Sequence, residues 1–250
     1  MHGVRIAGRP DAAYNLGSMF TGIVEGQGQV LSIAPHGGSA FRFVVDLAGL
    51  AQGIATGDSV ALDGTCLTAV AVHPPRVEFD VIQETVERTA FASLRPGDRV
   101  NVERSMPAQG RFHGHFVMGH VDATGRIAEK KLEPRQTRIK IEAPRDVVDQ
   151  MIFKGSVALD GVSLTLIEVT ETTFSVAIIP HTLQVTTLGL KEEGALVNVE
   201  VDLVGKWIRK LFAGYLGKKD APAGPEGKVV LPSSETLGLT FDALRRYGLG

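Results

Sequence analysis

The side chains best suited to chemistry in this sequence are a single cysteine, Cys66, and three neighbouring histidines, His113, His115 and His120. Imidazole is the usual proton carrier near neutral pH, and a thiolate is a strong nucleophile. The His-x-His-x4-His spacing also occurs in metal sites. Because no second cysteine or carboxylate cluster accompanies these histidines, we expect proton transfer and no metal ion or other cofactor.

The role of Cys66 is open between two alternatives. It could add to an electrophilic ring as a nucleophile, or it could be a small apolar filler, which is the commoner role of a lone buried thiol. The segment around it occurs twice, since residues 59–68 read SVALDGTCLT and residues 156–165 read SVALDGVSLT. Cys66 therefore corresponds to Ser163, and we expect two related pockets that differ at one reactive atom.

The repeat covers a complete domain. Gly64 corresponds to Gly161, an offset of 97 residues, and the same offset relates Gly22 to Gly119. It also relates the two VNVE segments that begin at Val100 and Val197. A period this long exceeds the roughly 20 to 50 residues of solenoid repeats, so each copy should close its own hydrophobic core.

Within each copy the apolar runs are short, rich in β-branched residues and separated by turn residues. The runs in the first copy cover residues 41–45, 58–62, 77–82 and 99–102. Several strands at this spacing in fewer than 100 residues favour a small antiparallel barrel over a sandwich. We therefore predict an all-β protein with two tandem barrels, the first over residues 19–115 and the second over residues 116–203.

The two ends of the chain have a different character. Residues 1–18 lack the apolar core of a signal peptide and are interpreted as an extension. We expect residues 204–250 to be a helical segment that follows Asp202, a candidate N-cap, and packs on its own barrels or on a partner subunit. A linker is predicted over residues 214–232, before a second short amphipathic pattern. The apolar face of the first helix comprises Val204, Trp207, Ile208, Leu211 and Phe212.

Composition excludes several classes of protein. The chain has 250 residues, of which 44% are hydrophobic and 22% charged, and its formal net charge is -2. This charge gives no footprint for nucleic acid or an anionic membrane surface. No apolar stretch approaches the roughly 20 residues that span a bilayer, and one cysteine cannot form an internal disulfide. We expect a cytoplasmic protein that binds neither nucleic acid nor membranes.

Several segments resemble the signature segments of the riboflavin synthase family, and the similarity runs from Met19 to about Phe212. The resemblance implies two six-stranded Greek-key barrels per chain and a homotrimer. It places the active site where the N-terminal barrel of one subunit meets the C-terminal barrel of its neighbour. The segments are MFTGIVE from Met19, VNVER from Val100, GHFVMGHVD from Gly114, TTLG from Thr186, and DGTCLT and DGVSLT from Asp63 and Asp160.

The family resemblance also implies an activity. Two molecules of 6,7-dimethyl-8-ribityllumazine would be converted, without a cofactor, into riboflavin and 5-amino-6-(D-ribitylamino)uracil, the last step of riboflavin biosynthesis. It allows an association with lumazine synthase. The alternatives are a non-catalytic lumazine- or flavin-binding protein of the same fold and, more remotely, a flavin reductase domain. The presence of His120, Lys154, Ser163 and Thr165 favours the enzyme.

The resemblance assigns one ring-binding site to each copy. The expected catalytic residues are Cys66, His115, His120, Ser163 and Thr165. Around one ring it places Phe20, Gly22, Ile23, Val24, Cys66, Leu67, Thr68, Asp80, Val81, Ile82, Gln83, Glu84 and Thr85. Around the other it places Gly119, His120, Val121, Lys154, Ser163, Leu164, Thr165, Ala177, Ile178, Ile179, Pro180, His181 and Thr182.

Three of these positions need comment. Phe20 either stacks on a ring or fills the barrel mouth, and the second role is the commoner one for an aromatic residue in a small barrel. His113 stands where the family usually has glycine. His181 replaces a glutamate that its counterpart Glu84 retains.

Overall fold

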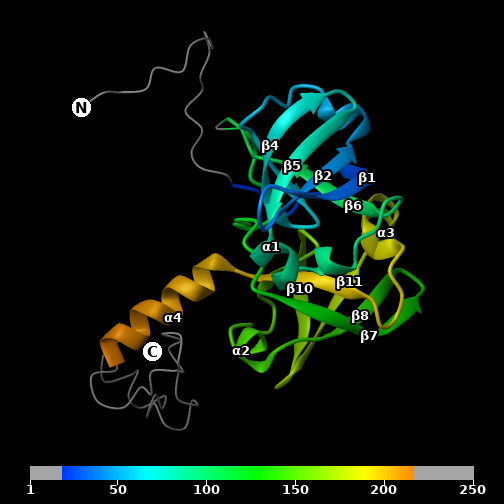
Figure 1. Cartoon of the computed structure of the whole chain (residues 1–250). Coiled ribbons are helices and arrows are strands. Elements are labelled where there is room, and N and C mark those ends of the chain that lie inside the picture. The colour runs from blue at the N-terminus through cyan, green and yellow to red at the C-terminus, as the bar shows by residue number, and fades with distance from the viewer. Residues whose placement is uncertain (1–18, 108, 217–250) are drawn as a thin grey trace, which may run out of the picture. The chain divides into compact units, whose positions relative to one another are not determined.

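The short β-branched runs and glycine turns form two closed six-stranded antiparallel barrels, as predicted. A computed structural model describes residues 19–107 and 109–216 (Figure 1). The first barrel consists of β1 (Gly26–His36), β2 (Ala40–Asp46), β3 (Ser59–Leu62), β4 (Thr65–His73), β5 (Arg76–Ile82) and β6 (Arg99–Arg104). The second consists of β7 (Ala123–Glu133), β8 (Gln136–Glu142), β9 (Ser156–Leu159), β10 (Val162–Val169), β11 (Thr173–Ile178) and β12 (Leu196–Val201).

Both barrels have the same Greek-key topology. The first closes in the order β1-β2-β5-β4-β3-β6, and the second in the equivalent order of β7 to β12. In each barrel three consecutive strands pair as hairpins, and the strand that follows them returns to lie beside the first of the three, as β6 does beside β3, which is the Greek-key arrangement. The ladders carry bulges at equivalent places, between Val30 and Ser32 and between Ile127 and Glu129. Such bulges increase local twist and help a short sheet to close.

Short helices connect the strands of each barrel. In the first barrel they are η1 (Ala48–Ala51), α1 (Gln83–Arg88) and η2 (Ala90–Ser93). In the second they are α2 (Arg145–Val148), α3 (Pro180–Val185) and η3 (Thr187–Gly189). α1 and α3 occupy equivalent positions directly after β5 and β11, so the duplication extends to these connections.

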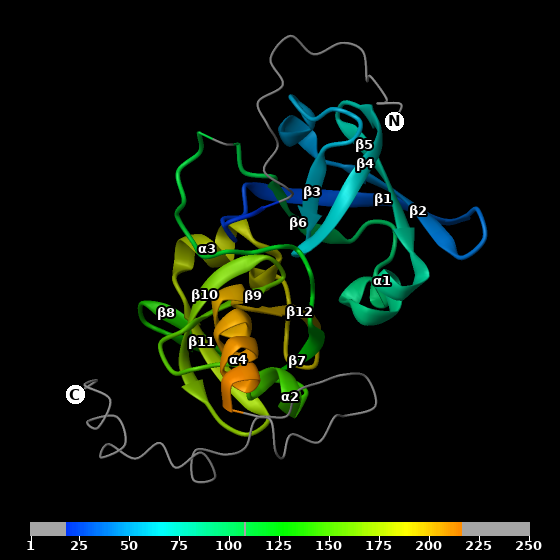
Figure 2. The same ribbon diagram turned by 90° about the vertical axis from the view of Figure 1, so that its left-hand side faces the viewer.

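Each barrel has its own hydrophobic core, and a third small cluster joins the two. Phe43 and Phe79 are fully buried in the first core, and Phe174 is fully buried in the second. The barrels lie next to each other in both views (Figures 1 and 2). The third cluster, where the copies meet, contains Phe20, Ala61, Val117 and Ala158.

Backbone groups of the two copies also touch directly. The β3–β4 and β9–β10 hairpins turn through Asp63-Gly64 and Asp160-Gly161, and all four residues have positive φ. This is the conformation that a two-residue hairpin requires. A Cβ atom on Gly64 would lie 2.5 Å from the Gly161 nitrogen. Only glycine therefore lets the two hairpins approach this closely.

A buried polar seam surrounds these hairpins. The Asn101 side chain donates to the Asp160 carbonyl at 2.9 Å, and Asn198 donates to the Asp63 carbonyl at 2.8 Å. Lys191 donates to Asp160 at 2.6 Å. Burial and the nearby Asp160 charge raise the pKa of Asp63 to about 7. These hydrogen bonds satisfy polar groups that would otherwise be unpaired in the protein interior.

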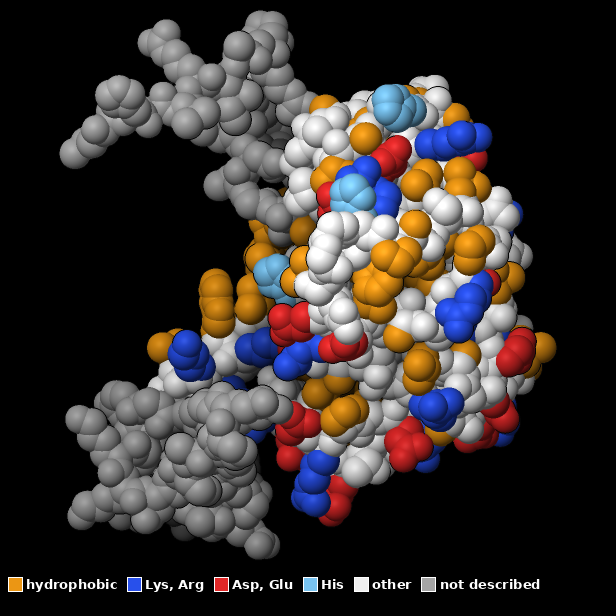
Figure 3. All heavy atoms as spheres, viewed as in Figure 1, with side chains coloured by type: hydrophobic (Ala, Val, Ile, Leu, Met, Phe, Trp, Pro, Cys, Tyr) orange, Lys and Arg blue, Asp and Glu red, His pale blue; other side chains and the backbone are white. Residues whose placement is uncertain are grey.

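The C-terminal part begins with α4 (Leu203–Leu216), which confirms the predicted helix. The predicted linker start at Gly214 is wrong, because the helix continues to Leu216. Apolar side chains are exposed along α4 (Figure 3), including Trp207 at 62% and Leu211 at 73%. No helix among the described residues is long and apolar enough to cross a membrane. The extension over residues 1–18 and the second amphipathic pattern lie outside the described residues.

Candidate functional site

At the positions expected to bind rings, the short segment before each barrel contacts the barrel of the other copy. We call the segments around Gly22 and Gly119 the exchanged segments. The Ser163 amide of the second barrel donates to the Gly22 carbonyl at 2.8 Å. Reciprocally, the Cys66 amide of the first barrel donates to the Gly119 carbonyl at 2.9 Å. An antiparallel bridge between Phe20 and Val117 joins the two exchanged segments. Each reactive side chain therefore lies beside a glycine from the other copy.

This arrangement corrects the grouping expected from the sequence. Gly22 was expected to share a site with Cys66, and Gly119 with Ser163. The hydrogen bonds show the opposite pairing, because the segment before each barrel crosses to its neighbour. A Cβ atom on Gly22 would lie 2.6 Å from the Ser163 Cβ, and one on Gly119 would lie 2.5 Å from the Cys66 Cβ.

Ser163 and His115 form the closest pair of candidate catalytic side chains. The His115 Nδ1 and the Ser163 Oγ are 2.7 Å apart. His115 is only 7% exposed, and its burial lowers the imidazole pKa, although the Asp202 charge opposes this effect. The Nε2 atom is buried and has no hydrogen-bond partner among the described residues. A neutral imidazole in this position can accept a proton at neutral pH.

The reactive strand residues point away from the barrel interiors. Thr68 follows Cys66 by two positions on β4 and is exposed, while Leu67 between them is buried in the core. Ser163 and Thr165 have the same relation on β10. Because side chains two apart share a face of a strand, each pair lies on the outer surface of its barrel. A flat ring bound there would remain open to solvent on one side of a single chain.

The sequence profile of the lumazine-binding domain matches residues 21–105 and 118–202. The chain is 39% identical over 203 residues to a riboflavin synthase of Actinobacillus pleuropneumoniae, covering 81% of this chain and 92% of the relative. It is 37% identical over 194 residues to a riboflavin synthase of Bacillus subtilis, covering 78% of this chain and 90% of the relative. The chain belongs to the riboflavin synthase family.

Solved structures share the architecture of this riboflavin synthase family member. A crystal structure of LumP complexed with riboflavin matches with a TM-score of 0.67 and 25% sequence identity. The match covers 73% of this chain and 99% of that chain. LumP complexed with 6,7-dimethyl-8-(1'-D-ribityl) lumazine matches with a TM-score of 0.66 and 24% identity over the same shares. The duplicated barrel is thus a fold found with lumazine and flavin ligands.

Several side chains that the family resemblance places against a ring are buried in this structure. Phe20 is 0% exposed and packs with Ala61 and Val117 where the copies meet, so its side chain neither stacks on a ring at the surface of the described chain nor fills a barrel mouth. Four aliphatic side chains of the expected sites also pack in the barrel cores, so only their backbone groups can meet a ligand. They are Leu67, Val81, Leu164 and Ile178.

Gly22, Gly119 and His115 of the expected sites are also buried, and most of the other expected residues are partly or fully exposed. Ile82 and Ile179 hold equivalent exposed positions at the start of α1 and α3. Lys154 is exposed and has a φ of 67°, at the place where the first copy has Gly57. A left-handed lysine costs roughly 1 kcal/mol or more. The second copy therefore keeps a cationic side chain at a position where glycine fits the backbone better.

The three histidines of the His-x-His-x4-His segment lie in different environments. His115 is buried beside Ser163, His120 is exposed, and His113 lines a cavity. Among the described residues, no three His, Cys, Asp or Glu side chains gather closely enough to hold a metal ion. The His-x-His-x4-His spacing therefore does not bring the three side chains together in the part of the chain that the structure describes.

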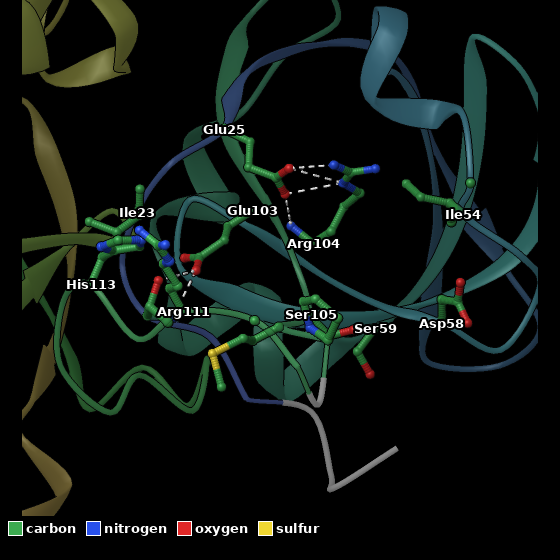
Figure 4. A pocket seen from close by; sticks show the side chains of 15 residues that line it. Ile23, Glu25, Ile54, Asp58, Ser59, Glu103, Arg104, Ser105, Arg111 and His113 are labelled. Atoms are coloured by element: carbon green, nitrogen blue, oxygen red, sulfur yellow. Dashed lines mark hydrogen bonds and ion pairs between the residues drawn. The ribbon is translucent and has the colours of Figure 1, made fainter. Parts of the chain in front are cut away.

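A cavity of about 610 Å³ lies beside the first barrel (Figure 4). Ile23 and Glu103 lie on one side of it, near the ion pair of Glu25 with Arg104. Ile23 is its only residue from the expected sites, and a second cavity of about 510 Å³ contains none. These two cavities therefore do not coincide with the expected ring sites.

Two buried glutamates near these sites were missed from the sequence. Glu103 is 6% exposed and accepts hydrogen bonds from the Thr21 and Gly22 amides, at 2.7 and 3.0 Å. Burial raises the pKa of Glu103 to about 7, although these hydrogen bonds oppose the shift. Its counterpart Glu200 binds the Met118 and Gly119 amides. The repeated VNVE segment was the available signal, since the same glutamate follows the same alternation of valine and asparagine in both copies.

We predict that Gly22→Ala and Gly119→Ala each destabilise the fold by about 3 kcal/mol or more, because the new Cβ would overlap Ser163 or Cys66 and the backbone would have to move. Gly37→Ala is the matched control. Gly37 also has a positive φ, but no atom lies within 4 Å of the added Cβ, so strain alone should cost about 1 kcal/mol. Urea unfolding of the three variants measures the difference, and equal losses would contradict the close contact.

Proposed function

We propose that this chain converts two molecules of 6,7-dimethyl-8-ribityllumazine into riboflavin and 5-amino-6-(D-ribitylamino)uracil, as a four-carbon-unit transferase. The observation that carries the proposal is the pair of matched outward-facing sites with different reactive groups. One site presents Cys66, and the other presents Ser163 with a hydrogen-bonded, buried His115. Family membership supports the same activity.

A duplicated site suits this reaction because it joins two copies of one substrate. One copy donates a four-carbon unit and the other accepts it, so two related pockets with unequal chemistry can hold the two roles. Holding both rings in register makes the reaction effectively unimolecular, a gain that can reach roughly 7 to 11 kcal/mol. Proximity can thus supply a large part of the catalysis without a cofactor.

The residues of the second site can move the necessary proton. The 7-methyl protons of the substrate are acidic because the ring delocalises the resulting anion. His115 is kept neutral by burial and holds the Ser163 hydroxyl at 2.7 Å, so the pair can accept or relay this proton. Thr165, on the same strand face as Ser163, can hydrogen-bond the ring edge. At the first site Cys66, Thr68 and His120 supply the polar groups.

We propose that the sites are completed between subunits of a homotrimer in the cytoplasm. Support comes from the outward-facing sites, which leave a bound ring half exposed, and from the apolar face of α4. This face holds Trp207 and Leu211 at 62% and 73% exposure. An association with lumazine synthase, which would supply the substrate directly, is compatible with such an assembly.

The experiment that tests the function is incubation of the purified chain with 6,7-dimethyl-8-ribityllumazine and no additive. We expect riboflavin absorbance to appear, with one riboflavin formed for every two substrate molecules consumed, and exhaustive chelation should not change the rate. The second candidate function, binding without catalysis, has support from the likeness to ligand-bound LumP. Tight binding of the lumazine without turnover would favour that candidate and contradict the enzyme.

We predict that His115→Asn lowers turnover about a hundredfold, which is typical for loss of a general base. The imidazole should titrate below the ordinary histidine value of about 6.5, because burial disfavours its charged form. The imidazole is then neutral and able to accept a proton at pH 7. NMR titration of the histidine ring signals in wild type and His115→Asn identifies the His115 signal. A His115 pKa above 6.5, or unchanged turnover, would argue against this role.

We predict that Trp207→Glu combined with Leu211→Glu breaks the trimer and abolishes turnover, because both charges fall on the exposed apolar face of α4. Light scattering should change from about three chains of 26.7 kDa to one. Lys210→Glu, which alters charge on the same helix outside that face, should leave the mass unchanged. A wild type that is monomeric and active would overturn the shared-site proposal.

A further inference from the structure

Glu103 and Glu200 accept hydrogen bonds from backbone amides of the two segments that cross between the copies. The Glu103 carboxylate accepts the Thr21 amide and hydroxyl at Oε1 and the Gly22 amide at Oε2, at 2.7, 3.1 and 3.0 Å. The Glu200 carboxylate accepts the Met118 and Gly119 amides at 2.7 and 3.0 Å. Both side chains are at least nine-tenths buried. The segments therefore take their position from two carboxylates of the barrel strands.

Each carboxylate is connected by one glycine to a reactive residue of the other barrel. Glu103 lies on β6 of the first barrel and binds Gly22, whose carbonyl accepts the Ser163 amide of the second barrel. Glu200 lies on β12 of the second barrel and binds Gly119, whose carbonyl accepts the Cys66 amide of the first barrel. Each series of hydrogen bonds therefore begins on a glutamate of one copy and ends on the reactive residue of the other copy.

We propose that Glu103 and Glu200 are positioning residues that act crosswise, Glu103 on the Ser163 site and Glu200 on the Cys66 site. This inference rests on the proposed function, because it concerns the geometry of the two pockets in that reaction. Neither carboxylate has to touch the substrate, since each acts through a glycine backbone.

The chemistry of the carboxylate explains why glutamate is needed. An ionised carboxylate offers acceptors on both oxygens, so it can bind two adjacent backbone amides at once. Glutamine of the same shape offers one acceptor and one amino group, and the amino group would face a backbone N–H. That amide would be left buried without an acceptor, so the Gly22 or Gly119 segment would shift away from its partner strand. The fold can keep its two cores while one site loses its alignment.

The test is a pair of double-mutant cycles measured at pH 8, above the pKa of about 7 that burial gives Glu103. Glu103→Gln and Glu200→Gln are made alone and in combination with Ser163→Ala or Cys66→Ser. We expect each glutamine variant alone to lower kcat about tenfold with KM changed less than about twofold, as expected for loss of a charge-assisted hydrogen bond without substrate contact. Glu193→Gln is the control, because Glu193 also accepts a backbone amide, that of Lys130, outside both sites.

The inference is decided by which glutamine variant is coupled, in its effect on kcat, to which of the Ser163→Ala and Cys66→Ser backgrounds. Glu103→Gln should have little further effect on kcat in the Ser163→Ala background and its full effect in the Cys66→Ser background, and Glu200→Gln should show the reverse. Coupling within the same copy, additive effects in both backgrounds, or a loss no larger than that of Glu193→Gln would overturn the proposal. A wild type without turnover would instead refute the proposed function.

A second variant guards against failure to fold. Thr21→Val removes only the hydroxyl contact with Glu103 and leaves both backbone amides in place. If Glu103→Gln gives no folded protein by circular dichroism, Thr21→Val takes its place in the cycle. A smaller loss of kcat with the same dependence on Ser163 supports the inference, and a loss that depends on Cys66 contradicts it.

Discussion

The rest of this structure depends on the reciprocal hydrogen bonds between the copies, from the Ser163 amide to Gly22 and from the Cys66 amide to Gly119. These bonds require a backbone approach that only glycine permits, because a Cβ at either position would overlap the opposite strand. They place the start of each copy on the barrel of the other. The two barrels are consequently joined at both candidate sites, each of which contains backbone from both copies.

The buried seam around Gly64 and Gly161 adds specificity to this pairing. Burying carboxylates is costly unless hydrogen bonds and counter-charges satisfy them, and Asn101, Asn198 and Lys191 do so here. The seam is nearly two-fold symmetric but not fully, since Lys191 has Leu94 as its counterpart in the first copy. The copies therefore have a defined relative placement while differing in charge.

The same partial symmetry characterises the reactive groups. Cys66 and Ser163 hold equivalent places beside equivalent glycines but carry different reactive atoms, and the His115 Nδ1 lies 2.7 Å from the Ser163 Oγ. Two substrates held in these sites would meet different proton chemistry. Such a difference suits a reaction between two identical molecules, because one must lose a fragment and the other must gain it.

The sequence by itself determined the duplication, the all-β class and the residues that can do chemistry. A shared offset between DGTCLT and DGVSLT can be read without coordinates, and alternating apolar residues at short spacing dictate strands. Equivalence in a repeat does not specify contact, however, because the offset of 97 residues says which positions match and not which positions touch. Only the tertiary structure decided that Gly22 meets Ser163, that Phe20 is core, and that Glu103 and Glu200 hold the segments. These facts depend on where the chain crosses between barrels, which is set by packing and buried hydrogen bonds between residues as many as 141 positions apart, such as Gly22 and Ser163.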